Sequence, residues 1–420
     1  MWSYDIRNNG DFIGPDPQPP MIAIIASEPK KGRTNFSFEL EVRLKRFKGF
    51  WQPTTGKILG RTRFENYHKG DSVLLLSRPE LLNPKIIRNP GFLNYLKRRN
   101  ITHQIYISEN ELRPIGRSQT ESLIGQLRNT VLKIMNTDFG NPEERAFAKA
   151  LLVGSREDLD PDLATAYTNT GVIHVVAISG MHLALIYALI SYLLKPLQNK
   201  RTRLIRTALI IMALWIFSLV CGASPSVVRS AVMFSFILTG EAIGRDHQIG
   251  NTLAGSAFLM LCIQPILLWD IGFQLSYAAV ASLLIYNKPL SALLVPENQI
   301  LNQAWNIIST TISAQILTTP LAIYHFGQFP ILFLLANIVA VPLSGIILIL
   351  LFLICILQPL GFSTPLAMIT GFLIRFMNDR IKALDNVSFA TIRNIHINIF
   401  DTINIYIILI ALTLWWRWKK

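Results

Sequence analysis

Residues 172–194 have the sequence VIHVVAISGMHLALIYALISYLL, and this stretch decides the class of fold. A transmembrane helix needs about 20 consecutive residues that are mostly apolar. Further apolar runs follow at residues 204–221, 225–243, 249–268, 270–287, 304–325, 329–358 and 400–416. We therefore predict a polytopic α-helical membrane domain over residues 172–420. Pro and Gly interrupt several of the runs, so broken or re-entrant helices are expected there.

The composition of the whole chain agrees with a membrane protein. The 420 residues are 51% hydrophobic and 16% charged, whereas soluble domains carry about 25% charged residues. This balance argues against a disordered chain, a coiled coil or collagen. Cys221, Cys262 and Cys355 all lie inside apolar runs, so a disulfide framework is not expected. The net charge of +14, with a basic N-terminal part, suits anionic lipid or nucleic acid as a partner.

A β domain is predicted ahead of the apolar runs. Residues 1–20 contain no apolar run of the signal-peptide kind, and their Pro-rich end predicts an extended linker. In residues 35–45, apolar and polar side chains alternate, which is typical of a half-buried strand. Comparable strands are predicted at residues 21–26, 56–63, 72–76 and 102–107. Five short strands favour an OB-like β-barrel over residues 21–115, and a small β-sandwich is the alternative.

A helical connector is predicted between the β domain and the membrane domain, over residues 116–171. Asn141 and Pro142 have the residue types of a helix cap and a first helical position. Near the other end of the chain, residues 361–385 are predicted to form an amphipathic helix on the membrane surface. Its expected apolar side consists of Leu366, Ile369, Leu373 and Phe376.

Several polar residues lie inside the apolar runs, where they are costly and therefore indicate function. His174 and His182 flank Ser179-Gly180, which can break the helix. They form either a polar constriction or a pair satisfied by neighbouring carbonyls. Arg229 lies one turn inside a helix that starts at Pro225, and it either attracts an anion or extends to the membrane surface.

Two more polar groups have both functional and structural explanations. Asp270 can cap a helix, but capping does not explain Gln274 and Ser276 in the same run. The span with Ser309, Ser313 and Gln315 is rich in hydroxyl groups, which either line a pore or hold helices together.

Several common enzyme motifs are absent from the sequence. The seven histidines show no HxH or HExxH spacing, so a hydrolytic zinc site is poorly supported. No Walker A motif and no GxSxG elbow occurs, so the chain does not resemble an ATP-driven motor or an α/β-hydrolase. We therefore predict no catalytic residue, no metal site and no cofactor, and we expect the protein not to be an enzyme.

Basic residues between the first two apolar runs predict the topology. Lys195, Lys200, Arg201, Arg203 and Arg206 fall in that loop, and such loops remain in the cytoplasm. The β domain is then expected on the outer, periplasmic side.

Several stretches of the sequence resemble the ComEC family, the inner-membrane channel proteins of bacterial natural transformation. The matching stretches are Asn89-Pro90-Gly91-Phe92, residues 150–154, residues 174–182, residues 225–229, residues 272–276, and Asn337 with Pro342. They occur in the family's order across residues 21–345. The resemblance implies an N-terminal OB-like domain followed by a multi-pass domain of the bacterial inner membrane. It also implies that one DNA strand enters the cytoplasm while a separate nuclease degrades the other.

The sequence departs from the family pattern at three points. Many members end in a metallo-β-lactamase-like domain with an HxHxDH motif, which this sequence lacks. Members usually carry transmembrane helices ahead of the OB-like domain, so the chain is expected to be a fragment of a longer protein. Asn94 stands where an acidic residue is expected.

The resemblance and the polar residues together define two candidate sites. The DNA path in the membrane would comprise His174, Ser179, Gly180, His182, Pro225, Ser226, Arg229, Asp270, Gln274, Ser276, Gln315 and Asn337. In the β domain, single-stranded DNA would contact Arg43, Lys45, Arg46, Lys48, Trp51, Lys57, Arg61 and Arg63, because basic and aromatic residues alternate there.

The predicted function is translocation of single-stranded DNA through the membrane. The expected partners are the DNA, the lipid bilayer, a DNA receptor outside and a cytoplasmic ATPase, and self-association is left open. Two other functions compete with this one. A secondary transporter of a small anion would explain Arg229 and the broken helices, although no internal repeat is visible. An intramembrane hydrolase would use Ser179 with His174 or His182, although no third orienting group is evident.

Overall fold

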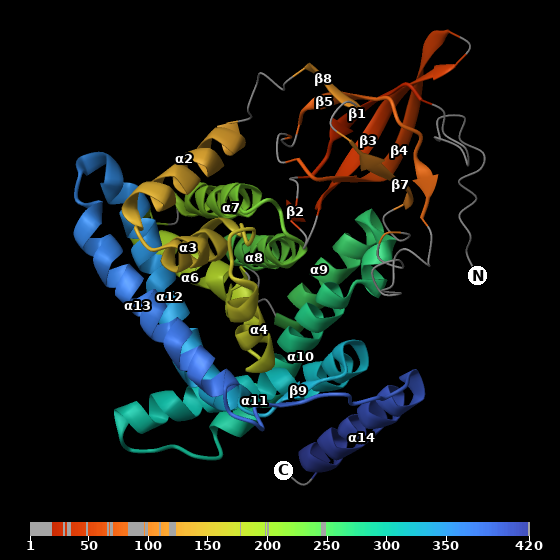
Figure 1. Cartoon of the computed structure of the whole chain (residues 1–420). Helices are drawn as coiled ribbons and strands as arrows, with labels where there is room; N and C mark the ends of the chain where they lie inside the picture. The colour runs from red at the N-terminus through yellow and green to blue at the C-terminus, as the bar shows by residue number, and fades with distance from the viewer. Residues whose placement is uncertain are drawn as a thin grey trace. The chain divides into compact units, whose positions relative to one another are not determined.

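The computed structural model of the protein describes residues 19–27, 30–31, 35–47, 49–64, 67, 70–82, 96, 100–108, 111–116, 123–176, 178–197, 199, 201–244 and 249–418. The chain divides into two compact units, Met1–Ser122 and Leu123–Lys420 (Figure 1). Residues 1–18 of the predicted linker, the stretch 89–92, Asn94 and Lys48 lie outside the described residues.

The first unit is a mixed β-sheet. Its strands are β1 (Met21–Ile25), β2 (Lys30–Lys31), β3 (Phe36–Phe47), β4 (Phe50–Thr62), β5 (Ser72–Leu75), β6 (Glu80–Leu81), β7 (Ile101–Ile107) and β8 (Leu112–Gly116). Their order is β6-β7-β4-β3-β1-β5-β8, with β2 beside β3. The β4–β7 pair is parallel, and the other pairs are antiparallel.

The alternating pattern of residues 35–45 places one side of β3 in the core of this unit. Phe38, Leu40 and Val42 are buried and pack with apolar residues of β1, β4, β5 and β7. All five predicted strands are present, and β2, β6 and β8 are additional. Between β7 and β8, the Glu111 N–H donates to the Ser108 carbonyl at 3.1 Å. Closure of the sheet into an OB-like barrel stays a prediction.

The second unit is helical. Its elements are α2 (Leu123–Asp138), α3 (Pro142–Val153), α4 (Pro161–Asn169), α5 (Ile173–Val176), α6 (Gly180–Leu193), η2 (Lys195–Leu197), α7 (Arg203–Val220), α8 (Pro225–Ile243), α9 (Ile249–Ile263), η3 (Pro265–Trp269), α10 (Ile271–Ser291), α11 (Gln299–Phe326), β9 (Phe329–Pro330), α12 (Phe333–Leu357), η4 (Gln358–Leu360), α13 (Ser363–Asp385), β10 (Thr391–Ile392) and α14 (Ile399–Trp418). The predicted fold class, a β domain followed by a helical domain of membrane type, is confirmed.

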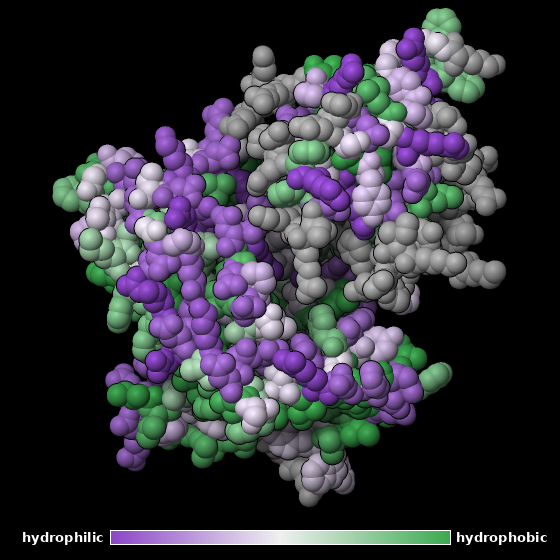
Figure 2. Space-filling model, in the orientation of Figure 1, coloured by the Kyte–Doolittle hydropathy of each residue, from purple (hydrophilic) through white to green (hydrophobic). Residues whose placement is uncertain are grey.

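Five helical segments are long and apolar enough to cross a membrane by length and composition. They are Arg203–Val220, Pro225–Ile243, Gln299–Phe326, Phe333–Leu360 and Ile399–Trp416. Helices α6 and α9 are apolar but shorter. Figure 2 shows hydrophobic side chains gathered in the region where Figure 1 labels α11 and β9.

Interruptions by Gly or Pro have different outcomes in two of the apolar runs. The run 172–194 is divided into α5 and α6, with Ile178 and Ser179 outside both helices. His174 and His182 are therefore not on one face of a continuous helix. The run 329–358 contains one helix, α12, which passes through Pro342 and is not divided into two half-spans.

The helix expected at residues 361–385 is present as α13, and its location on a membrane surface stays a prediction. Ile369 and Phe376 are exposed, and Leu366 and Leu373 are partly buried. The buried side consists of Ser363, Ala367, Thr370, Gly371, Ile374, Met377, Asn378 and Ile381. Polar groups on other helices stabilise this side, and a count of apolar residues along one helix cannot detect them.

The predicted connector shares its core with the membrane-type helices. Residues of α2, α3 and α4 pack in one hydrophobic cluster with residues of α6, α7, α8, α12 and α13. Asn141 caps α3, since its side chain accepts a hydrogen bond from the Glu143 N–H at 2.9 Å, and Pro142 is the first helical residue.

Candidate functional site

Arg229 lies in the second turn of α8, inside the helical unit. Pro225 starts the helix, because its fixed φ suits a first position and its missing N–H costs nothing there. The Arg229 side chain is buried, with only 2% of the residue exposed. Within the described part of the chain, its Nε and Nη1 atoms have no hydrogen-bond partner. A buried guanidinium with unmade hydrogen bonds is energetically unfavourable and requires an explanation.

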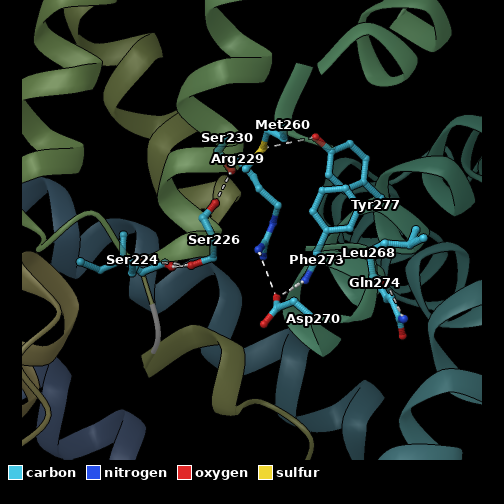
Figure 3. Close-up of polar contacts among 11 residues, drawn as sticks. Ser224, Ser226, Arg229, Ser230, Met260, Leu268, Asp270, Phe273, Gln274 and Tyr277 are labelled. Carbon is cyan, nitrogen blue, oxygen red and sulfur yellow. Dashed lines mark hydrogen bonds and ion pairs between the residues drawn. The ribbon is translucent and has the colours of Figure 1, made fainter. Parts of the chain in front are cut away.

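Asp270 is the acidic partner of Arg229. The Nη1 atom of Arg229 lies 3.9 Å from Oδ1 of Asp270, which is too long for a hydrogen bond (Figure 3). The same oxygen accepts the Phe273 N–H at 2.7 Å and thereby caps α10. Asp270 therefore balances the charge of Arg229 while its hydrogen-bonding capacity is used by the helix.

Gly272 leaves room for this approach of the two charged groups. A Cβ atom at Gly272 would lie 3.1 Å from Oδ1 of Asp270 and 3.7 Å from Nη2 of Arg229. Two aromatic residues of α10 lie near the Arg229 side chain. The ring centroids of Phe273 and Tyr277 are 4.4 Å apart (Figure 3). The Tyr277 hydroxyl lies 3.2 Å from Oγ of Ser256 on α9.

The N-terminus of α6 contacts the same end of α8. The Ser226 hydroxyl donates to the Ile178 carbonyl at 3.0 Å, so α8 satisfies a carbonyl of the segment between α5 and α6. A Cβ atom at Gly180 would lie 2.8 Å from Oγ of Ser230, so only glycine permits this distance without movement of the serine. The Ser230 hydroxyl itself donates to the Ser226 carbonyl at 3.0 Å.

His182 lies at this junction and is completely buried. Its Nδ1 atom accepts the Ser179 N–H at 3.1 Å and lies 3.2 Å from the Ser179 hydroxyl. A neutral imidazole that accepts at Nδ1 carries its proton at Nε2. Nε2 has no hydrogen-bond partner among the described residues, so it is a buried donor available to a ligand.

The N-termini of three helices therefore meet through α8. α8 contacts α6 through Ser226 and Ser230, and it contacts α10 through Arg229. A helix N-terminus presents unpaired N–H groups and a positive partial charge, which favour an anion. With Arg229 between these helices, the arrangement suits an oxyanion such as phosphate.

Other residues of the predicted path form separate groups. Gln274 lies 3.3 Å from Nε2 of His325 and donates to the Leu268 carbonyl at 2.9 Å. Gln315 accepts the Thr319 hydroxyl at 3.0 Å within α11. Asn337 is 3% exposed, and its Oδ1 atom has no partner in the described ranges. Ser276 is partly buried and His174 is exposed, and no described contact joins either of them to Arg229.

The hydroxyl-rich span serves helix packing at its best-defined contacts. Ser282 of α10 donates to the Ser313 carbonyl of α11 at 2.5 Å and accepts the Leu317 N–H at 3.2 Å. Ser309 and Ser313 bond to carbonyls of their own helix. For these residues, the contacts agree with a role in holding helices together rather than with a role in lining a pore.

The basic residues of the β unit separate into different environments. Arg43 forms a 3.1 Å ion pair with Glu41, and Lys57 is the register partner of Glu41 on β4. At one end of the β3–β4 hairpin, Arg61 donates to the Tyr106 hydroxyl at 2.8 Å and lies over its ring, 5.5 Å from the centroid. At the other end, Arg46 is the register partner of Trp51.

A cavity of about 630 Å³ opens at the Arg61 end of this hairpin. Its lining includes Asn35, Arg61, Arg63, Phe64 and Tyr106. Arginine and exposed aromatic rings are the groups that hold phosphates and stack bases. Among the described residues, no cluster of His, Cys, Asp and Glu could hold a metal ion.

The sequence of the helical unit matches a known family. The Competence protein family matches residues 151–419, which is more than half of the chain. The chain belongs to the competence protein family. This match covers the whole Arg229 site and all the helices that pack around it.

Individual relatives support the same conclusion. ComE operon protein 3 of Bacillus subtilis is 29% identical over 201 residues, covering 48% of this chain and 25% of the relative. Recombination protein 2 of Haemophilus influenzae is 26% identical over 214 residues, covering 48% of this chain and 27% of the relative. An uncharacterized protein of Aquifex aeolicus is 24% identical over 223 residues, covering 52% of this chain and 50% of the relative. No solved structure matches the chain.

The matches with these relatives cover a quarter to a half of each relative's length. The family match begins at residue 151, so the β unit, α2 and most of α3 lie outside it.

Sequence analysis missed some of the residues that surround these sites. Ser230 follows Ser226 by one helical turn, a spacing that places both on one face of α8. Tyr106 lies near the end of the predicted strand 102–107, and an aromatic residue there was a usable signal. Tyr277 and Ser256 gave no comparable signal, because isolated polar residues in apolar helices are common as helix-packing groups.

Proposed function

We propose that the chain forms a channel through which single-stranded DNA crosses the inner membrane into the cytoplasm during natural transformation. Membership of the competence family supports a role in DNA uptake. The observation that carries the channel is Arg229, which is buried among apolar helices with hydrogen-bonding atoms unpaired.

The energetics of Arg229 favour a recurrent anionic ligand. An arginine at the centre of a bilayer costs about 2.5–3.5 kcal/mol on insertion scales. Its guanidinium has five N–H donors, and the 3.9 Å contact with Asp270 makes little use of them. A phosphate that passes the site would supply acceptor oxygens, and the N-termini of α8 and α10 would add favourable dipoles.

The length of α6 supports a polar site at membrane depth. Its 14 residues measure about 21 Å, whereas the hydrocarbon core of a bilayer is about 30 Å thick. The basic residues that follow α6 favour a position of its C-terminal end near the membrane surface. Its N-terminus, with Ser179 and His182, would then end within the hydrocarbon layer. Such helix ends are tolerated where they line a water-filled cavity.

In this proposal, the β unit lies on the periplasmic side and binds the incoming strand with little sequence preference. The cavity with Arg61, Arg63 and Tyr106 provides the phosphate and base contacts. The chain translocates DNA and has no catalytic role. A receptor outside delivers the DNA, a separate nuclease removes the other strand, and a cytoplasmic ATPase supplies the driving force.

Transport of a small anion is a second candidate, because the Arg229 site would also fit such a substrate. A hydrolase is supported by the 3.2 Å contact between Ser179 and His182. However, the same Nδ1 atom already accepts the Ser179 N–H. A nitrogen whose lone pair is occupied in this way is a poor general base, so the contact favours a structural role.

The channel is tested with Arg229→Gln in cells that lack the native gene. We expect uptake of labelled DNA into a nuclease-protected form to fall at least about tenfold, because the loss of one charged hydrogen-bonding partner is worth about 1.5–3 kcal/mol. Arg229→Lys should retain part of the uptake, since it keeps the charge but loses the bidentate geometry. Membrane abundance is measured by immunoblotting in each strain.

Arg203→Gln is the matched control, because Arg203 is an exposed arginine at the start of α7. Normal uptake by the Arg229→Gln variant would refute the proposal. Lost uptake with lost abundance would assign Arg229 to folding alone. Normal DNA uptake together with loss of transport of a small labelled anion would favour the second candidate.

A further inference from the structure

The turn end of the β3–β4 hairpin carries three exposed aromatic side chains. Phe50 is 76% exposed, Phe47 is 53% exposed and Trp51 is 42% exposed. Arg46 and Gln52 complete this hairpin tip, which comprises residues 46, 47 and 49–52. Large aromatic groups gathered at one exposed point mark an interaction surface rather than a random surface composition.

The register of the hairpin shows that aromatic groups occupy both of its faces. Phe47 pairs with Phe50, and Arg46 pairs with Trp51. Successive side chains on a strand point to opposite faces, so the Phe47–Phe50 pair lies on one face and Trp51 on the other. A groove that binds a ligand would have its aromatic residues on one face of the hairpin. A hairpin that inserts into a lipid bilayer has apolar residues on both faces.

The tip extends past the neighbouring strands of the sheet. Strand β1 pairs with β3 as far as Lys45, and β7 pairs with β4 from Lys57 onward. Among the described strands, β3 alone pairs with β4 between Phe50 and Gly56. Figure 1 shows this two-stranded arm leaving the rest of the β unit.

Single-stranded DNA is a poor fit for the tip. The Arg61–Tyr106 cavity lies at the other end of the hairpin, where Arg61 pairs with Ser37. Arg46 follows Ser37 by nine positions on β3, which corresponds to about 30 Å. Between these two points, Arg43 is paired with Glu41. Glu39 and Glu41 also lie on β3 between the two points, so acidic residues interrupt the basic residues that lead from the cavity to the tip.

A lipid interface fits the tip better. Aromatic rings are enriched at the headgroup level of membranes, and arginine and lysine side chains near them reach the phosphates. The β unit is joined by residues 117–122 to a unit with five helices suited to a bilayer. Both units belong to one chain, so the tip is always part of a protein whose helices suit a bilayer.

We propose that the hairpin tip inserts into the headgroup region of the bilayer that holds the helical unit. Phe47, Phe50 and Trp51 enter the boundary of the acyl chains, and the Arg46 guanidinium contacts lipid phosphate. This contact is independent of DNA transport, and it fixes the β unit at one point of the membrane surface.

The test uses the full chain with its native cysteines replaced and Phe50→Cys introduced for a fluorescent label. The protein is reconstituted in vesicles of phosphatidylcholine and phosphatidylglycerol, with or without brominated acyl chains. We expect brominated lipid to quench most of the label fluorescence. Single-stranded DNA added outside should leave the fluorescence unchanged.

Ile115→Cys is the matched control, because Ile115 is a 54% exposed residue of β8 in the same unit. Its label should not be quenched by brominated lipid. Substituting Phe47→Ser and Trp51→Ser should reduce the quenching of the label at position 50. The proposal is overturned if brominated lipid does not quench that label, if both positions are quenched equally, or if only DNA changes its fluorescence.

Discussion

Two arginines of the helical unit lie at opposite kinds of helix end. Arg128 of α2 donates from Nη1 to the Val153 carbonyl at 2.9 Å and to the Val220 carbonyl at 2.6 Å. These carbonyls belong to the last residues of α3 and α7, where a positive charge complements the helix dipole. Arg229 lies at helix N-termini, where its own charge is disfavoured. Arg128 therefore stabilises the fold, whereas Arg229 lowers the stability of the fold.

Arg128→Ala should destabilise the protein by about 1.5–3 kcal/mol, since it removes charged hydrogen bonds to two helix ends. Thermal unfolding of the purified protein in detergent measures the loss. Arg145→Ala is the control, because Arg145 is partly buried and its described side-chain contact is one long, exposed hydrogen bond of 3.4 Å to the Gly140 carbonyl. The control should change stability by less than about 0.5 kcal/mol. Equal losses in the two variants would contradict the assigned role of Arg128.

At the residue scale, the sequence identifies the components of the site but not their contacts. Arg229 and Asp270 are recognisable because charges are rare in apolar runs. Their ion pair depends on how α8 packs against α10, and no local pattern encodes that packing. Arg128 was missed because an arginine in an amphipathic helix resembles an ordinary surface residue until its two carbonyl partners are located.

At the element scale, α13 shows how polar partners decide which side of a helix is buried. Glu144 of α3 is 6% exposed and is paired with Arg375 of α13. The neighbouring Glu143 accepts Lys382 at 3.0 Å and Asn378 at 2.9 Å. These bonds allow α13 to bury a side with polar residues and leave apolar residues exposed. Hydrophobic periodicity therefore predicted the existence of α13, whereas the side that it buries depends on polar partners from α3.

Gly371→Ala should destabilise the protein by about 1–3 kcal/mol, as overpacked sites commonly do. The new Cβ atom would overlap the buried Glu144 carboxylate, which cannot move without losing Arg375. Gly250→Ala is the matched control in α9, where a Cβ atom would meet no atom within 4 Å. That change should be neutral or stabilising by up to about 1 kcal/mol. The denaturation midpoints of the two variants are compared in the same detergent. A Gly371→Ala protein as stable as the unchanged protein would contradict the close packing of Gly371 against Glu144.

At the scale of the whole molecule, the order of the two units followed from composition and periodicity. The five predicted strands and most of the helices also followed from local patterns. The parallel β4–β7 pair did not, because its strands are almost 40 residues apart and no turn connects them directly. The division of the run 172–194 into α5 and α6 was indicated by Ser179-Gly180, but its stabilisation by Ser226 depends on a distant helix.

The sidedness of the membrane predicts a labelling difference between two positions. Asn199 is exposed in the basic loop after α6, and this loop is expected in the cytoplasm. In a background without native cysteines, Asn199→Cys should resist a membrane-impermeant reagent applied to spheroplasts. Ile115→Cys in the β unit should react. The reverse result would place the β unit in the cytoplasm and remove it from incoming DNA.

The ion pair between Arg229 and Asp270 has a consequence for biosynthesis. The ribosome adds Asp270 41 residues after Arg229, and at about 5–20 residues per second this takes about 2–8 s. During that interval α8 carries a guanidinium whose balancing carboxylate has not been made. Insertion of α8 into lipid is therefore less favourable before α10 has been made than after it.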